Sequence, residues 1–268
     1  MVHDIPAPKA RQWTRARIAG TVLVCLWLAV FIALFFFLVG SWDRELFDRW
    51  TWPYISGLGT TLSLVAISTV LGAILSVPIA WARMSNNRFV GALAYAYVYF
   101  FRGTPLLAQT FLIYYGLGSF RAELESVGLW VFFREAWYCA ILAFTLNTSA
   151  YQAEILRGAI ESVPRGQWEG AQALGLHDGL TLWKIILPQA MIVALRPYGN
   201  EVVLMIKSSA VVALITVPDL MGATRLAYSR SFDFQTYVWA ALIYLSLVEI
   251  LRHGVEWIER RITIHLHR

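Results

Sequence analysis

The sequence contains little charge. Asp, Glu, Lys and Arg make up 15% of its 268 residues, whereas about 25% is usual in soluble domains. Apolar residues make up 58% and aromatic residues 15%, so most of the chain is predicted to lie in lipid rather than in water. The net charge of +5 does not by itself indicate nucleic-acid binding, because positive charge also collects on the cytoplasmic loops of membrane proteins.

Residues suited to catalysis, metal binding and disulfides are also scarce. Cys25 and Cys139 both lie in apolar stretches, where a thiol behaves as a small hydrophobic group. The five histidines lie in tails, in loops or at the end of an apolar stretch, without metal-ligand spacing. No Gly-Lys dipeptide occurs, which excludes a Walker-type phosphate-binding loop. We therefore predict no catalytic and no metal site, and a process driven by ATP would need another chain to bind the nucleotide.

Six apolar stretches are long enough to cross a bilayer core of about 30 Å at about 1.5 Å per residue. They are residues 18–40, 54–82, 89–120, 138–156, 190–217 and 236–257. The third is interrupted at 102–105 by the sequence Arg-Gly-Thr-Pro, which is tolerated at membrane depth where the backbone faces protein or water. The expected outer loops are residues 41–53, 121–137 and 218–235.

Lys and Arg concentrate on one side of this arrangement. The tail at 1–17, the turn at 83–88 and the end of the chain from Arg252 are all basic, which predicts that both termini are cytoplasmic. The first apolar stretch is longer than the h-region of a signal peptide, so we expect it to remain as an anchor. We find no internal repeat of the kind that many secondary transporters contain.

The polar segment 157–188 is too patterned to be a simple linker. Pro164 can occupy the first turn of a short helix, and Gly175 can supply a left-handed cap after it. A second short helix is expected to start with Asp178 as its N-cap and to end at Pro188.

The first of these short helices has one small apolar face. Trp168, Ala171 and Leu174 recur every three residues along it. Because the rest of the segment is polar, this face is predicted to dock on another surface.

The fourth apolar stretch carries a polar stripe. Asn147, Tyr151, Glu154 and Gly158 follow one another at steps of four, three and four, so they share one helix face. The stripe could form hydrogen bonds between helices, at no more than about 1 kcal/mol each, or it could line a solute path.

Glu201 lies near the middle of the fifth stretch, where an ionised carboxylate in lipid costs a few kcal/mol or more. It should therefore face a cavity or a partner. Lys207 lies about 120° away around the helix, whereas Ser208 shares the face of Glu201. The carboxylate could bind a cationic or amino group of a solute, or it could pair with Arg196 or Arg102.

Arg102 allows two interpretations of the same kind. Its guanidinium could bind the carboxylate of a solute through two hydrogen bonds, or it could hold two helices together. Gln109, Tyr114 and Tyr115 follow on the same stretch, and tyrosines at such positions more often pack or anchor than bind ligand.

The segment 157–188 resembles the coupling loop of ATP-binding-cassette importer permeases. The signature of that loop is Glu-Ala-Ala, three residues, Gly, nine residues, Ile, one residue and Leu-Pro. The matching residues keep every spacing and are Glu169, Gly170, Ala171, Gly175, Ile185, Leu187 and Pro188. Gly170 stands where the family has its first Ala, which weakens the helix by about 1 kcal/mol.

Three further stretches resemble the polar amino-acid branch of these permeases, which includes the histidine, lysine-arginine-ornithine, octopine and nopaline permeases. They are RGTPLLAQTFLIYYGL at 102–117, LNTSAYQAEILRGAIESVPRGQ at 146–167 and GNEVVLMIKSSAVVALITVPDLMG at 199–222. The resemblance extends from Tyr54 over nearly the whole remaining chain. Residues 1–50 depart from it, because typical members have five spans and begin outside the membrane.

The resemblance implies an all-α integral membrane protein of the bacterial plasma (inner) membrane. Its fold would be the MetI-like transmembrane domain of a type I importer, with about six membrane helices and a cytoplasmic coupling helix. We expect a basic cytoplasmic tail at 1–17, an extra membrane helix and outer loop at 18–50, and the permease domain with its coupling loop at 51–268.

The implied function is that of a permease subunit in an ATP-driven importer for a polar, preferably basic, amino acid or an opine. The implied partners are a second permease chain, with a paralogous chain favoured over an identical one, two ATPase subunits that bind ATP and Mg, and an extracytoplasmic solute-binding protein. The chain itself would hold no cofactor, would be surrounded by lipid and would bind no nucleic acid.

The resemblance also implies roles for particular residues. The expected substrate path comprises Glu201, Asn147, Gln109, Ser208, Tyr151 and Arg102. The expected ATPase docking site comprises Pro164, Glu169, Gly170, Ala171, Leu174 and Gly175.

Two other functional classes remain possible from the residues alone. An ion-coupled secondary amino-acid transporter would use Glu201, Lys207 and Arg102, but it would leave the segment 157–188 without a purpose. A scaffold or assembly subunit would lack a polar cavity between the fourth and fifth spans.

Overall fold

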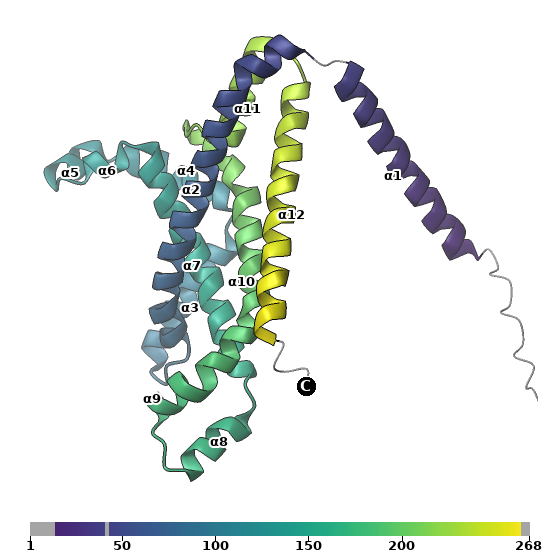
Figure 1. Cartoon of the computed structure of the whole chain (residues 1–268). Coiled ribbons are helices and arrows are strands. Elements are labelled where there is room, and N and C mark those ends of the chain that lie inside the picture. Colours follow the sequence, from purple (N-terminus) through teal and green to yellow (C-terminus); the bar gives the residue numbers. More distant parts are fainter. Residues whose placement is uncertain (1–13, 41–42, 264–268) are drawn as a thin grey trace, which may run out of the picture. The chain divides into compact units, whose positions relative to one another are not determined.

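The computed structural model describes residues 14–40 and 43–263, and all regular secondary structure in these ranges is helical. The chain divides into two units, residues 1–48 and 49–268, which we describe separately. Figure 1 labels the helices.

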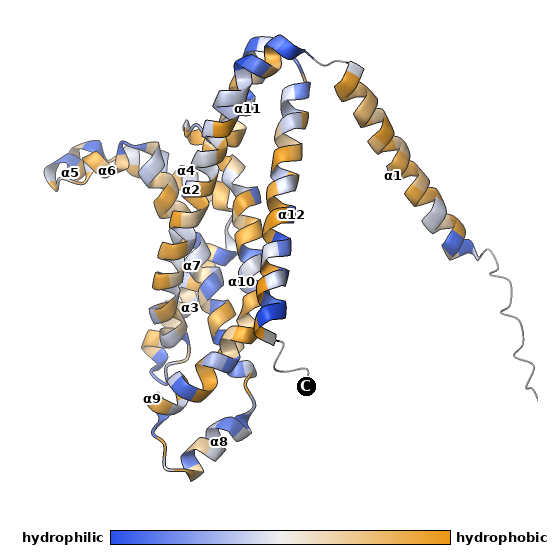
Figure 2. Cartoon of the chain, viewed as in Figure 1, coloured by the Kyte–Doolittle hydropathy of each residue, from blue (hydrophilic) through white to orange (hydrophobic). Residues whose placement is uncertain are grey.

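The first unit contains helix α1 (Arg15–Gly40), which has no buried residue. It is hydrophobic along nearly all of its length (Figure 2). Its 26 residues span about 39 Å at about 1.5 Å per residue, so the first expected span is confirmed as a helix of sufficient length. Most of the expected basic tail, residues 1–13, lies outside the described residues.

The second unit is a bundle of long helices joined by shorter ones. The long helices are α2 (Arg44–Arg83), α3 (Arg88–Gly103), α7 (Ala136–Ser162), α10 (Leu187–Ser209) and α12 (Gln235–Thr263). The shorter helices are α4 (Leu106–Phe111), η1 (Leu112–Gly116), α5 (Arg121–Ser126), α6 (Trp130–Phe133), α8 (Arg165–Ala173), α9 (Asp178–Thr181), η2 (Leu182–Ile186), η3 (Ala210–Ile215) and α11 (Leu220–Ser231).

Within the described residues, four helices are long and apolar enough to cross a membrane. They are Arg15–Gly40, Arg44–Arg83, Asp178–Ile215 and Gln235–Ile262. The third expected span is the broken element formed by α3, α4 and η1. The fourth is α7, which has 27 residues but is too polar to meet the same criterion.

Helix α7 is polar because other helices surround it. Its buried side chains include Thr145, Asn147, Thr148, Ser149 and Gln152. It packs against α10 on one side and against α3 and α4 on another. A helix in this position meets protein instead of lipid, so its buried polar groups can form hydrogen bonds between helices.

The break in the third span falls where the sequence predicts it. Helix α3 starts after Asn87, whose side chain accepts hydrogen bonds from the backbone N–H groups of Phe89 and Val90. It ends at Gly103, and α4 starts after Pro105. Proline has no N–H to donate and disfavours a helical residue before it, which ends the helix at this point.

The structure differs from expectation in the three outer loops, because all three segments contain helix. Helix α2 already starts at Arg44, because Asp43 accepts hydrogen bonds from the N–H groups of Glu45 and Leu46 at 2.9 and 3.2 Å. The second loop contains α5 and α6, and the third contains α11. Asp219 caps α11 by accepting from the N–H of Gly222 at 2.8 Å, and burial raises the pKa of this carboxyl above its usual value.

The N-terminal half of α2 packs tightly on the start of this third connection. Leu220 donates its N–H to Thr61 Oγ1 at 3.1 Å, and Tyr54 donates its hydroxyl to the carbonyl of Thr236 at 2.7 Å. At Gly57, an added Cβ would lie only 2.7 Å from the carbonyl oxygen of Asp219. Glycine is therefore required here by the close approach of two backbones.

We expect Gly57→Ala to destabilise the protein, because backbone atoms would have to separate to admit the methyl group. The cost of such overpacking is about 1–3 kcal/mol. Thermal unfolding in detergent, followed by size-exclusion chromatography, would measure it. Gly59→Ala is the matched control, because nothing lies within 4 Å of its Cβ position, and an equal effect of the two substitutions would contradict this account of the packing.

Candidate functional site

The segment 157–188 lies at one end of the bundle, opposite α11 (Figure 1). Helix α8 follows Pro164, which directly precedes its first residue. Gly175 adopts the left-handed conformation with φ of +74°. Glycine takes this conformation at the end of a helix without the strain that a residue with a Cβ would have. The expected first helix of this segment and its glycine cap are confirmed.

The apolar face of α8 is divided between the chain's own core and solvent. Ala171 is buried, and Trp168 packs against a core cluster that includes Ile160 and Leu182. Leu174 is 79% exposed. Trp168 and Ala171 therefore dock on the chain's own core, because α8 folds back onto α7 and η2, and this leaves Leu174 exposed. The other expected docking residues, Pro164, Glu169, Gly170 and Gly175, are exposed.

The second helix of the segment differs from expectation at both ends. His177 caps it by accepting from the N–H of Leu180 at 3.2 Å, and Asp178 is the first helical residue. The helix does not end at Pro188. It continues through the π-helical turn η2 into α10, with Pro188 in the first turn of α10, where a missing N–H is tolerated.

A cluster of arginines surrounds Glu154 on α7. Arg83 of α2 lies 2.9 Å and Arg157 of α7 lies 2.8 Å from its carboxylate oxygens, and Arg102 of α3 lies at 3.9 Å. The Glu154 side chain is 13% exposed, so the pairs are partly shielded from solvent. One carboxylate of α7 thus connects this helix to the ends of α2 and α3.

Gln109 and Asn147 serve the break between α3 and α4. Gln109 donates from Nε2 to the carbonyls of Phe101 and Thr104 at 2.9 and 3.0 Å. Asn147 donates from Nδ2 to the carbonyl of Phe101 and to Gln109 Oε1, both at 3.0 Å. These bonds satisfy backbone groups that the break frees at membrane depth. Both residues were expected on the substrate path, and their contacts here are with the chain itself.

Tyr151 and Arg102 also contact one another beside this break. The Arg102 guanidinium lies over the Tyr151 ring at 5.1 Å from its centroid, a cation–π geometry. The Tyr151 hydroxyl donates to the Arg102 carbonyl at 3.4 Å. Arg102 therefore holds α3 against α7 and keeps an exposed side chain.

Glu201 lies between α10 and α7 and is 5% exposed. Its Oε1 accepts a hydrogen bond from Thr148 Oγ1 at 3.0 Å, and Thr148 in turn accepts from Gln152 Nε2 at 3.1 Å. Among the described residues, Glu201 forms no ion pair with either arginine considered for it. Arg196 pairs instead with Glu259 at 2.7 Å.

The structure therefore brings together a buried carboxylate and a short chain of hydroxyl and amide groups. A carboxylate can accept about four hydrogen bonds, and Thr148 supplies one. Ser208, which shares the face of Glu201, is half-buried on the same helix. A carboxylate with such unused capacity can bind a cationic group. No cluster of metal-ligating residues occurs in the part of the chain that the structure describes.

Sequence analysis did not single out Thr148, Gln152, Arg83 or Arg157. The four-residue step between Thr148 and Gln152, both on the α7 face that meets α10, was a signal for the first two. Arg83 was taken only as a marker of the cytoplasmic side and Arg157 only as the start of the segment 157–188. Their common partner Glu154 could not be inferred without the packing of α2 on α7.

Long apolar helices with a polar interior, together with a short exposed helical segment at one end, are the features expected of a membrane-embedded permease. The chain belongs to the family described as the inner membrane component of binding-protein-dependent transport systems, whose model matches residues 68–264. This range is more than half of the chain.

Similar proteins of known role include three amino-acid or opine permeases. The nopaline transport system permease protein NocM of Agrobacterium fabrum is 45% identical over 76% of this chain and 86% of its own. The arginine permease protein ArtM of Haemophilus influenzae is 35% identical over 81% and 95%. ArtM of Escherichia coli K12 is 38% identical over 77% and 93%.

Solved structures agree with the fold. The crystal structure of an amino acid ABC transporter with histidines superposes with a TM-score of 0.73 at 32% identity, over 82% of this chain and 99% of that one. A structure of the MetNI methionine transporter in an inward-facing conformation superposes with a TM-score of 0.67 at 18% identity, over 83% and 100%, which shows the fold alone. The chain is thus a permease subunit of an ATP-binding-cassette transporter, with the type I MetI-like fold, and not an ATPase subunit.

We expect Glu154→Gln to destabilise the protein, because three guanidinium groups would lose their shared carboxylate. Hydrogen bonds to charged groups contribute about 1.5–3 kcal/mol each when buried, and partial exposure reduces this. The unfolding temperature in detergent would measure the loss. Glu161→Gln is the matched control on the same helix, because Glu161 is 53% exposed and pairs with Arg157 alone. Equal unfolding temperatures for the two variants would contradict the central role of Glu154.

Proposed function

We propose that this chain is the membrane subunit of an ATP-driven importer that carries a polar, preferably basic, amino acid or an opine into the cytoplasm. The observation that carries the proposal is the buried Glu201 carboxylate at the contact of α10 with α7. The named substrates of the similar proteins, nopaline and arginine, both offer cationic nitrogen groups to such a carboxylate.

The exposed residues of the segment 157–188 support attachment to an ATPase. Glu169, Gly170 and Gly175 are all exposed at the end of the bundle, and the segment follows the coupling-loop pattern. In the proposed complex, two ATPase subunits bind these segments and supply the ATP and Mg sites, a second permease chain completes the membrane part, and a solute-binding protein delivers the substrate from outside.

The basic residues support an orientation with both termini in the cytoplasm of a bacterial cell, in the inner membrane. Arg83 and Arg88 flank the turn at the same end of the bundle as the segment 157–188, and Arg260 and Arg261 lie in the last turn of α12. The division of the chain at residues 48 and 49 supports an added N-terminal helix at 18–50 in addition to the permease domain at 51–268.

The alternative function is an ion-coupled amino-acid transporter that works without ATP. Buried Glu201 favours it, since membrane carboxylates often bind coupling ions or protons. The exposed segment 157–188 has no role in that mechanism. Uptake by liposomes that contain the chain and an ion gradient but no ATP would support the alternative and overturn the importer.

We expect Glu201→Gln to lower the uptake of a cationic amino acid such as arginine by about 10-fold or more, because a charge-assisted hydrogen bond of about 1.5–3 kcal/mol would be lost. The initial rate of ATP-dependent uptake by liposomes containing the whole complex would measure it. Glu123→Gln on the exposed helix α5 is the control for removing a carboxylate. Unchanged uptake by Glu201→Gln, in an intact complex, would contradict a contact with the solute.

We expect an ATPase subunit to co-purify with the wild-type chain from its native host in mild detergent, and Glu169→Lys to reduce the amount recovered. The substitution reverses a charge at the proposed docking site without touching the core, because Glu169 is exposed. Quantitative mass spectrometry would measure the ATPase recovered per permease chain, with Glu123→Lys as the control. Recovery of the wild-type chain without any ATPase would overturn the proposed function, whereas undiminished recovery with Glu169→Lys would remove this residue from the docking site.

A further inference from the structure

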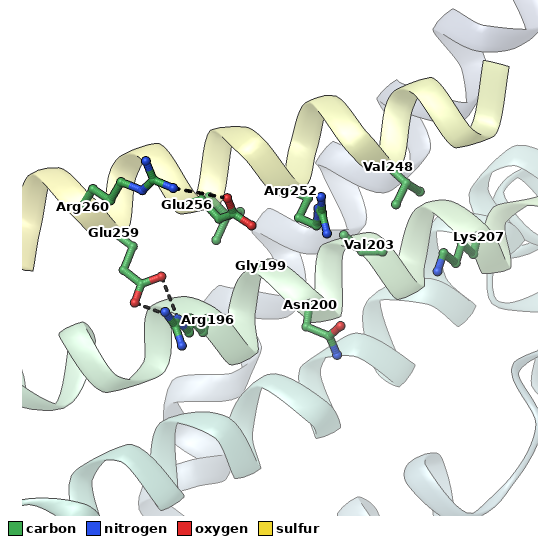
Figure 3. Close-up of a pocket in the computed structure, with 11 residues that line it drawn as sticks. Arg196, Gly199, Asn200, Val203, Lys207, Val248, Arg252, Glu256, Glu259 and Arg260 are labelled. Carbon is green, nitrogen blue, oxygen red and sulfur yellow. Dashed lines mark hydrogen bonds and ion pairs between the residues drawn. The ribbon is translucent and has the colours of Figure 1, made fainter. Parts of the chain in front are cut away.

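Two grooves of the bundle differ in their chemistry. The first, of about 1100 Å³, lies between α10 and α12 and is lined by charged side chains, among which Arg196 and Glu259 pair at 2.7 Å (Figure 3). The second lies where α2 meets α7 and the segment from α8 to α10. We call it the α2 groove. It consists of two adjoining sections of about 520 and 810 Å³, which share the lining residues Trp81, Met84, Ile160 and Leu182.

The smaller section of the α2 groove is apolar. Its wall on α2 is formed by side chains that recur every three or four residues and therefore share one helix face. They include Thr69, Ala73, Ser76, Ala80 and Met84. Another wall is formed by Leu187, Met191 and Leu195 of α10. Among the described residues, none that lines this section is charged.

This section opens to the outside of the bundle. Four of its large apolar side chains are exposed, namely Val77, Trp81, Trp183 and Met191. From Thr69 to Trp81 the section follows α2 for about 18 Å at about 1.5 Å per residue. One leaflet supplies about half of a bilayer core of about 30 Å. The section therefore has the length and the polarity to hold an acyl chain.

The larger section of the α2 groove adds polar side chains at the end of the bundle that carries the segment 157–188. They are Ser85, Asn86 and Asn87 of the turn after α2, Gln172 of α8 and Asp178 of α9. Asp178 is the only charged residue that lines either section in the described part of the chain. Its carboxylate and the amides of Asn86 and Gln172 make no side-chain hydrogen bond or ion pair with another described residue.

The two sections together match an amphiphile with one cationic end. A carboxylate without a partner favours a group that combines positive charge with N–H donors, and a primary ammonium group has three such donors. A headgroup that carries only a phosphate would place a second negative charge beside Asp178, which is unfavourable. In a zwitterionic headgroup, the amides of Asn86 and Gln172 can donate to the phosphate oxygens.

We propose that the α2 groove is a binding site for a phospholipid with a primary amino headgroup. One acyl chain lies along α2 past Ala73, and the ammonium group binds the carboxylate of Asp178. The bound lipid thereby connects α2 and α7 with the segment 157–188. This site goes beyond the proposed function, because it depends neither on which solute is carried nor on what drives the transport.

Native mass spectrometry tests the headgroup. The protein is purified in mild detergent with the chains that accompany it, freed of lipid, and titrated with phosphatidylethanolamine, phosphatidylcholine or phosphatidylglycerol of identical acyl chains. We expect phosphatidylethanolamine to bind about 10-fold more tightly than the other two, because only its headgroup combines N–H donors with a positive charge. Equal affinities for the three lipids would overturn the assignment of an amino headgroup.

Asp178→Asn tests the polar section, because it keeps the size of the side chain and removes its charge. The affinity for phosphatidylethanolamine should fall about 10-fold, to that for phosphatidylcholine. Glu161→Gln is the matched control, since Glu161 is 53% exposed and lines neither section. An unchanged preference for phosphatidylethanolamine in Asp178→Asn would contradict the contact of Asp178 with the headgroup.

Ala73→Trp tests the apolar section. Ala73 is exposed, so tryptophan at this position fills the groove without entering the packed core, and one lipid fewer per chain should bind. Ile74→Trp is the matched control, because Ile74 is 66% exposed and lines neither section. Size-exclusion chromatography checks that both variants stay folded.

Two results with these tryptophan variants would overturn the site. The first is equal lipid binding by folded Ala73→Trp and Ile74→Trp, which would place the bound lipid elsewhere. The second is the loss of a protein chain instead of a lipid from Ala73→Trp alone, which would show that protein covers the groove.

Discussion

The fold depends on the burial of a polar helix inside a membrane bundle. Helix α7 can cross the bilayer because α2, α3, α4 and α10 cover its polar groups and form hydrogen bonds with them. Asn147 closes the break after α3, and Thr148 holds Glu201 of α10. Unsatisfied polar groups cost several kcal/mol in lipid. The hydrogen bonds of α7 therefore fix the positions of the helices around it.

The same hydrogen bonds distinguish two kinds of polar side chain in the candidate site, those whose hydrogen bonds are all used within the fold and those that can still accept donors. Gln109 and Asn147 are committed to backbone carbonyls and to one another. Glu201 is bound by one hydroxyl and retains capacity for other donors. Lys207 lies about 120° away around the same helix, so α10 carries a buried carboxylate on one face and an exposed ammonium on another.

Much of this was predictable from local patterns. The break at Pro105, the cap at Gly175 and the helical spans follow from proline, glycine and runs of apolar residues, whose effects act within a few positions. The packing of Trp168 and Ala171 on the core was not predictable, because it depends on α8 folding back onto α7. Nor was the passage of the helix through Pro188, since a π-helical turn before the proline accommodates it and has no signature in the sequence.

That passage has a mechanical consequence. From Asp178 to Ile215 the backbone forms one continuous rod of 38 residues, about 57 Å long at about 1.5 Å per residue. A push on α9 at one end is thus transmitted to η3 at the other end without an intervening loop. The π-helical turn η2 and the 3₁₀ turn η3 are the places where this helix can twist, so a force applied at α9 would rotate the segment that leads to α11.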